Sequence, residues 1–210
     1  MSNKKIVEQS VEVYFREFRK LVEKIPQREL KKAVEILLAT RDKKGTVFAL
    51  GCGGSASTAS HFACDLAKCT ISPGKKRFKA ISLVDNVPLV SAWVNDNGWE
   101  SIFAEQLEPW LSEKDLLVCF SVHGGSGRGK TDPWSQNLVQ AMELAKKRKA
   151  KILGFAGFDG GAMKEMADVC LIVPVSSEPL ATPLIESFHV VLHHLICGVI
   201  LKRIIEEENE

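Results

Sequence analysis

Two short segments of the sequence combine glycine with serine, GCGGS at 51–55 and SVHGGS at 121–126. Each follows an apolar run. Glycine lets the backbone come close to an anion, and the N–H groups at a helix start point toward it with a favourable dipole. Neither segment has the glycine spacing of a Walker loop or a dinucleotide fingerprint, so a tight turn is the alternative for each alone. Together they indicate a phosphate site, with candidate ligands Gly53, Gly54, Ser55, Ser121 and Ser126.

A histidine and an aspartate follow the first of these segments, four residues apart. On a helix, His61 and Asp65 would share one face. Taken alone, they are as readily explained as solvated polar residues.

The segment 185–196, IESFHVVLHHLI, holds three of the five histidines of the chain just after an acidic residue. Its apolar residues predict one broad buried face, formed by Ile185, Phe188, Val191, Leu192 and Leu195. The other side would carry Glu186, His189, His193 and His194. Two imidazoles and two carboxylates from two helices would suit zinc or a similar divalent metal, and equally a general acid and base.

Short apolar strands alternate with helices along the chain. Residues 4–42 predict two helices separated at Pro26. We expect strands at 46–51, 79–84, 116–121, 151–157 and 169–175, and helices at 55–68, 86–94, 99–111, 134–149, 161–167 and 183–207. This succession predicts an α/β fold, a doubly wound, parallel five-stranded sheet with helices on both faces and an N-terminal helical extension. No internal boundary or repeat is evident, so residues 1–210 are expected to form a single domain. Both glycine–serine segments then follow carboxyl ends of strands, where such sheets bind ligands.

Composition narrows the class of protein. With 45% hydrophobic and 26% charged residues, the chain has a globular profile. Its net charge of +2 gives no bias toward nucleic acid. We find neither a signal peptide nor the roughly 18 uncharged apolar residues that a membrane span needs. The six cysteines lack paired zinc-type spacings and fit a reducing compartment. We expect a cytoplasmic protein with neither nucleic acid nor a membrane as a partner.

Five motifs, spread over about residues 10–205, resemble in sequence and order those of the sugar isomerase (SIS) family, specifically its phosphoheptose isomerase branch. The resemblance is carried by GCGGSASTASHFACDL, VNDNGWESIFAEQL, DLLVCFSVHGGSG, GFDGGAMKEMADVCLIVP and IESFHVVLHH. It implies a flavodoxin-like fold and interconversion of sedoheptulose 7-phosphate and D-glycero-D-manno-heptose 7-phosphate, for nucleotide-heptose and surface-glycan synthesis. It also implies a homotetramer that combines residues of neighbouring subunits around one zinc ion per subunit.

By matching position, the resemblance implies a role for each candidate residue. The metal ligands would be His61, Asp65, Glu186 and His194, with Asp65 as general base and His194 as general acid. The glycine–serine turns would hold the phosphate, and Asn95, Asp96 and Glu186 would lie near the sugar.

The sequence departs from the family pattern at several of these positions. The family usually has Glu where Asp65 stands and Gln where Glu186 stands. Val122 and His123 interrupt the hydroxyl-rich second turn. The segment 127–137 is longer than usual, and Arg128 or Lys130 would supply phosphate charge there.

Two other functions remain open. A non-catalytic member would bind a phosphosugar or a protein partner, as in the branch that binds a replication initiator. An isomerase of another ketose phosphate would keep the chemistry and change the substrate. His61 and His194, present together with two acidic residues, favour an enzyme.

Overall fold

The computed structural model describes residues 3–126, 134–175 and 179–206. In chain order its elements are α1 (Asn3–Val22), α2 (Gln27–Asp42), β1 (Thr46–Gly51), α3 (Gly54–Lys68), β2 (Lys79–Ser82), α4 (Val87–Asn97), α5 (Ile102–Leu107), β3 (Leu116–Phe120), α6 (Gln136–Lys147), β4 (Lys151–Gly157), α7 (Gly161–Met166), β5 (Val169–Val173) and α8 (Ala181–Glu206). Every predicted strand and helix is present. The boundaries differ most where a predicted helix at 99–111 forms only over α5.

The five strands are all parallel, in the order β2-β1-β3-β4-β5. Parallel neighbours need crossover connections, and these are made by helices. After β1 the chain moves outward to β2 and then returns to place β3 on the other side of β1. This order confirms the predicted doubly wound, flavodoxin-like α/β fold, with its topological switch point between β1 and β3.

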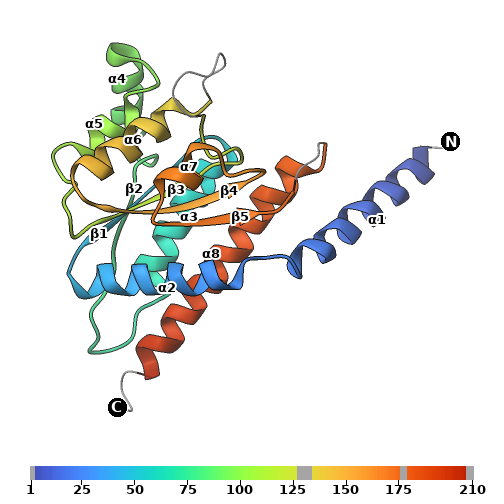
Figure 1. Cartoon of the computed structure of the whole chain (residues 1–210), viewed down its shortest axis with the longest axis horizontal. Coiled ribbons are helices and arrows are strands. Elements are labelled where there is room, and N and C mark those ends of the chain that lie inside the picture. Colours follow the sequence, from blue (N-terminus) through green and yellow to red (C-terminus); the bar gives the residue numbers. More distant parts are fainter. Residues whose placement is uncertain (1–2, 127–133, 176–178, 207–210) are drawn as a thin grey trace.

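Helices cover both faces of the sheet (Figure 1). In β3, Leu116, Val118 and Phe120 face one apolar layer, whereas Leu117 and Cys119 face the other. Successive side chains of a strand point to opposite faces, so a strand covered on both sides is a continuous apolar run. Helices α2, α3 and α8 pack on the first face, and α5, α6 and α7 on the second.

The N-terminal helix α1 extends away from the sheet (Figure 1). The Tyr14 hydroxyl lies 2.9 Å from the Ser187 hydroxyl of α8, and the Phe18 ring stacks on Phe188 with centroids 4.5 Å apart. Five large apolar side chains of α1 are nevertheless exposed: Ile6, Val7, Val11, Phe15 and Val22. The predicted helical extension is therefore present, with an apolar surface that the described part of the chain leaves uncovered.

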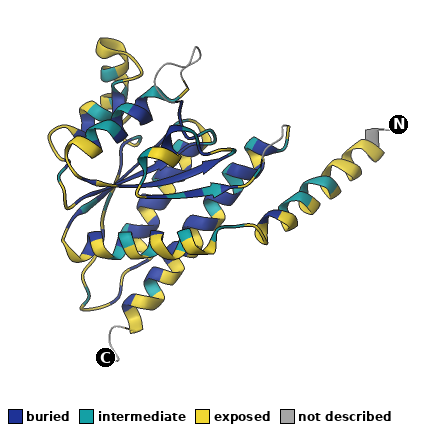
Figure 2. Cartoon of the chain, viewed as in Figure 1, coloured by how far each residue is buried: buried dark blue, intermediate teal, exposed yellow. Residues whose placement is uncertain are grey.

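The buried face of α8 differs from the predicted one (Figure 2). Ile185, Phe188 and Leu192 are buried as expected. Val191 and Leu195, expected inside, are 45% and 49% exposed, whereas His189 and His193, expected on the polar side, are fully buried. A helix that is apolar nearly all round does not fix its inward face by pattern alone.

Helix α8 is also, among the described residues, the one helix long and apolar enough to cross a membrane by length and composition. Half of its apolar stretch is buried inside this protein. Its apolar character therefore reflects a place in the core, and Glu186 and Lys202 leave it without the roughly 18 uncharged apolar residues that the sequence analysis required of a membrane span.

Candidate active site

A cavity of about 140 Å³ opens beside the carboxyl ends of β1 and β3, at the switch point of the sheet. Open parallel sheets bind their ligands at this place. Both glycine–serine turns contribute to it. Its lining includes Cys52, Ser55, Phe120, Ser121, Val122, His123, Ser135, Leu138 and Glu186.

The first turn leads from β1 into α3. Gly53 has a φ of +57°, which glycine adopts readily, and Gly54 is the first residue of the helix. A Cβ at Gly54 would lie 2.5 Å from Oε1 of Glu186, so a larger residue there would require that carboxylate to move. Ser55 is buried and lines the cavity. The Glu186 carboxylate thus lies at the positive end of the α3 dipole, facing the predicted phosphate turn.

The second turn is held by its own hydrogen bonds. The Ser121 hydroxyl accepts from the Gly124 N–H at 3.1 Å and lies in the cavity lining. Ser126 instead accepts from the Trp134 N–H at 2.6 Å, so its hydroxyl serves the turn. His123 stacks on Phe158, with centroids 4.6 Å apart, and its position in the cavity brings an imidazole where the family pattern has a hydroxyl.

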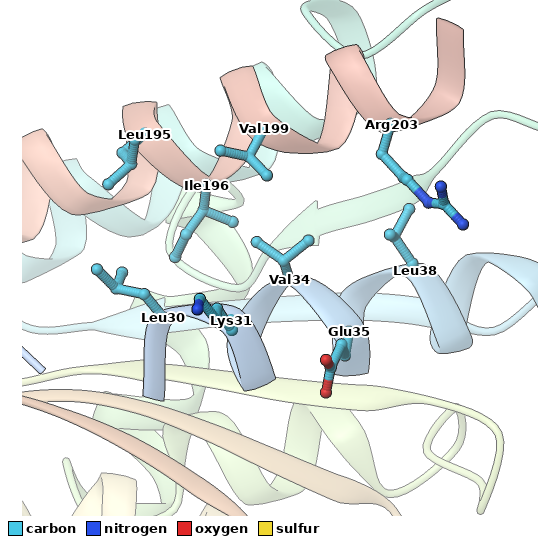
Figure 3. A pocket seen from close by; sticks show the side chains of 9 residues that line it. All are labelled: Leu30, Lys31, Val34, Glu35, Leu38, Leu195, Ile196, Val199 and Arg203. Carbon is cyan, nitrogen blue, oxygen red and sulfur yellow. The ribbon is translucent and has the colours of Figure 1, made fainter. Parts of the chain in front are cut away.

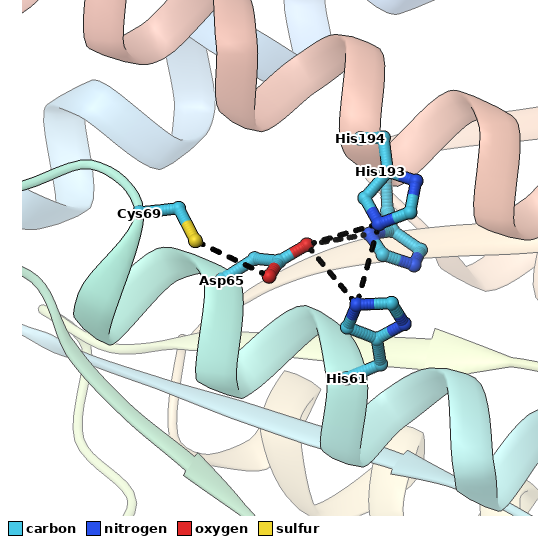
Figure 4. Close-up of polar contacts among 5 residues, drawn as sticks. All are labelled: His61, Asp65, Cys69, His193 and His194. Atoms are coloured by element: carbon cyan, nitrogen blue, oxygen red, sulfur yellow. Dashed lines mark hydrogen bonds and ion pairs between the residues drawn. The ribbon is translucent and has the colours of Figure 1, made fainter.

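A second group of polar residues lies farther along α3 and α8, which pack side by side (Figure 4). Oδ2 of Asp65 is 3.6 Å from Nε2 of His61, 3.5 Å from Nδ1 of His193 and 3.3 Å from Nε2 of His194. The Nε2 atoms of His61 and His194 are 3.3 Å apart. We call these four residues, His61, Asp65, His193 and His194, the imidazole–carboxylate cluster.

The cluster has a buried and an exposed side. Asp65 and His193 are 7% and 0% exposed, whereas the side chains of His61 and His194 are about half exposed. Within the described residues, neither ring nitrogen of His193 has a hydrogen-bond partner. Burial lowers the pKa of His193 to about 4, an effect that His194 and His61 reinforce and Asp65 opposes. A neutral imidazole with two unpartnered nitrogens beside a buried carboxylate fits a divalent metal, which prefers such donors.

The structure divides the predicted site residues into groups. Gly54, Ser55, Ser121 and Glu186 gather at the cavity, while His61, Asp65 and His194 gather in the cluster. Glu186 stands seven residues before His193 on α8, about 10 Å along the axis.

Other candidates lie elsewhere in the structure. Asn95 and Asp96 are exposed on α4, where the Asn95 amide donates to the Asp96 carboxylate at 2.7 Å, and neither is part of the cavity lining. Arg128 and Lys130, and most of the 127–137 segment, lie outside the described residues.

The sequence analysis gave no role in the site to His193, or to the cavity residues Cys52, His123, Ser135 and Leu138. The signal for His193 was its place beside His194 in the sequence. Cys52 and His123 lay inside the two turns already singled out.

Comparison with known proteins identifies the family to which the chain is similar. The model of the SIS domain matches residues 13–157. The lincomycin biosynthesis protein LmbN of Streptomyces lincolnensis is 50% identical over 78% of this chain, and the match spans only 58% of its own length. A phosphoheptose isomerase of Helicobacter pylori is 36% identical over 83% of both chains.

A solved structure agrees with these sequence matches. The phosphoheptose isomerase GmhA from Neisseria gonorrhoeae superposes with a TM-score of 0.79 at 28% identity, covering 92% of this chain and 98% of its own.

Proposed function

The chain belongs to the SIS domain family, in its phosphoheptose isomerase group, and we propose that it interconverts sedoheptulose 7-phosphate and D-glycero-D-manno-heptose 7-phosphate. The observation that carries this proposal is the placement of two sites on one pair of helices. Ser55 and Glu186 lie at the cavity near the starts of α3 and α8, and the imidazole–carboxylate cluster lies farther along both. Ser55 and His61 are separated by about 9 Å along α3. A sugar phosphate bound by its phosphate at the turns can therefore present its other end to the cluster.

Isomerisation needs a proton removed from the carbon beside a carbonyl and returned to the neighbouring carbon. Asp65 serves as the base that removes it, and His194, 3.3 Å away, supplies a proton to the oxygens. Ser55, Ser121 and the glycine backbone hold the phosphate, so binding energy far from the reacting carbons orients them. Glu186 at the cavity, with Asn95 and Asp96 from a neighbouring subunit, would contact the sugar hydroxyls.

A zinc ion held by His61, Asp65 and His194 would act as a Lewis acid and stabilise the negative charge that develops on the sugar oxygens. The support for it is the donor set of the cluster and the unpartnered nitrogens of His193 beside it. The family resemblance implies Glu186 as the fourth ligand.

A homotetramer with shared active sites is part of the proposal. A groove between α2 and α8 is lined by apolar side chains, among them Leu30, Val34, Leu195 and Val199 (Figure 3). With the exposed apolar side of α1, it offers surface that another copy of the chain would bury.

A cytoplasmic location agrees with the free cysteines of the structure.

Two biosynthetic routes are candidates for using the product. Surface-glycan synthesis follows from the phosphoheptose isomerase resemblance. The 50% identity to LmbN favours a second, synthesis of an antibiotic, because lincomycin biosynthesis is what that protein is named for.

The test is turnover of purified protein, followed by NMR in deuterated water with seven-carbon and six-carbon ketose phosphates. We expect an aldose phosphate and deuterium at the carbon next to the carbonyl with sedoheptulose 7-phosphate, loss of both on chelation, and recovery with zinc. Binding of the phosphosugar without exchange or turnover would identify a non-catalytic module instead. Faster turnover of a six-carbon substrate would identify another ketose phosphate isomerase.

A further inference from the structure

The metal set of this protein departs from the one that the family resemblance implies. Among the described residues, His193 is buried with no hydrogen-bond partner for either ring nitrogen. Glu186, the residue at the family's fourth ligand position, lies against Gly54 in the cavity instead. We infer that His193 is a ligand of the metal in place of Glu186, so that the set is His61, Asp65, His193 and His194. This inference rests on the metal-dependent isomerase proposed above.

The separations within the cluster match a metal site. Zinc bonds of 2.0–2.1 Å in a tetrahedron place neighbouring ligand atoms about 3.3–3.4 Å apart. Oδ2 of Asp65 lies 3.3–3.6 Å from one nitrogen of each of the three histidines, and two of those nitrogens are 3.3 Å apart. Ligand nitrogens of the three histidines all lie within 4.8 Å of one another. A zinc ion would draw the His193 ring closer to the other two histidines to complete the tetrahedron.

The packing around His193 supplies a reason for its orientation. Its ring makes edge contacts with the apolar Phe62 ring on one side and with His61 of the cluster on another, with centroids 5.8 Å and 4.9 Å away. Burying an imidazole whose nitrogens make no hydrogen bond is costly, and a bound cation removes that cost. The shorter side chain of Asp65 also fits, because a buried histidine nearby fills space that a longer Glu would need.

A ligand set with His193 in place of Glu186 has a different net charge. Zinc with three neutral imidazoles and one carboxylate keeps a net charge of +1, whereas a set with both Asp65 and Glu186 would be neutral. A more positive centre polarises the sugar carbonyl more strongly. Glu186 is then left to serve the substrate at the cavity.

Zinc binding to purified variants tests this inference without relying on turnover. Competition with a chromophoric chelator should show that His193→Leu weakens zinc by roughly 100-fold or more, beyond the 10–100-fold that losing a second-shell partner costs. Glu186→Ala should keep the parent affinity for zinc while losing turnover. His189→Gln, which changes the other buried histidine of α8, is the matched control and should bind zinc as the parent does.

X-ray absorption of the zinc-loaded parent protein covers the case in which His193→Leu does not fold. Three imidazoles at the metal support the inference, and two overturn it. It is also overturned if His193→Leu binds zinc as the parent does, or if Glu186→Ala loses it. A protein that holds zinc through three histidines without isomerising a sugar phosphate would contradict the proposed function and leave this inference standing.

Discussion

The carboxylate of Glu186 lies against the Cα of Gly54, so close that a Cβ there would stand 2.5 Å and 2.6 Å from its two oxygens. The two residues belong to α8 and α3, and their contact fixes where the carboxylate enters the cavity. The absence of a side chain at Gly54 therefore leaves room for a carboxylate of another helix at the predicted phosphate turn.

Gly54→Ala should displace Glu186 by about 1 Å. A shift of that size in a positioning group costs about 100-fold in rate, so kcat/KM should fall to that extent while zinc affinity stays unchanged. Steady-state kinetics and chelator competition measure the two. Gly198→Ala, where an added Cβ meets no atom within 4 Å, is the control and should keep parent kinetics. Loss of zinc in Gly54→Ala would contradict the separation of the two sites.

Asp65→Asn should abolish turnover, because the amide is neither a base nor an anionic ligand. Asp65→Glu, which restores the usual family residue, should also lower kcat by about 100-fold, since its carboxylate moves by about 1 Å among three imidazoles already in place. Full activity of Asp65→Glu would mean that the cluster adapts to either length.

His123 lines the cavity and stacks on Phe158, so its imidazole is held beside the phosphate turn. His123→Ala should raise KM for the sugar phosphate by about 10-fold with kcat unchanged, the pattern of a group that binds substrate and transition state equally. A fall in kcat with KM unchanged would place His123 in the chemical step instead.

His189 makes the stability of the protein depend on pH. Burial lowers its pKa from 6.5 to about 4, against a weaker opposing effect of its hydrogen bond with the Ala156 carbonyl. At a pH between about 4 and 6.5, His189 is protonated in the unfolded chain and neutral in the folded protein. The free energy of unfolding therefore falls as pH falls. From pH 7 to pH 5 the loss from this residue is about 2 kcal/mol.

His189→Gln removes this titration and can still donate to Ala156. Chemical denaturation of parent and variant at several pH values should give a shallower decline for the variant between pH 7 and pH 5. Parallel declines would mean that His189 is already protonated in the folded protein.

The exposed apolar side of α8 should hold the oligomer together. Leu195→Glu puts a charge on a half-exposed position of the groove and should shift the proposed tetramer to smaller species in sedimentation velocity. Trp110→Glu, also at an exposed apolar position but away from the groove, is the control. A Leu195→Glu protein that remains tetrameric would move the interface elsewhere.

The parallel sheet could be predicted because short, largely apolar runs alternate with helices along the chain, and β1 and β3 lead directly into turns rich in glycine and serine. The meeting of the two glycine–serine turns at one cavity followed from the same signal. The inward face of α8 could not be predicted from the sequence. Val191 and Leu195 are apolar but half exposed, whereas the core contains the polar His189 and His193. Hydropathy assigns a histidine to water, whereas the buried His189 contacts an aromatic ring and the Ala156 carbonyl, and the buried His193 lies beside the Asp65 carboxylate.

Placing the anchor and the reacting end on the same two helices has a consequence for selectivity. Helical rise fixes the interval between Ser55 and His61, and no loop intervenes that could shorten or lengthen it. In the proposed function, the pair α3–α8 would therefore select for carbon-chain length: a shorter sugar phosphate bound at the turns would not reach the cluster, and a longer one would extend past it.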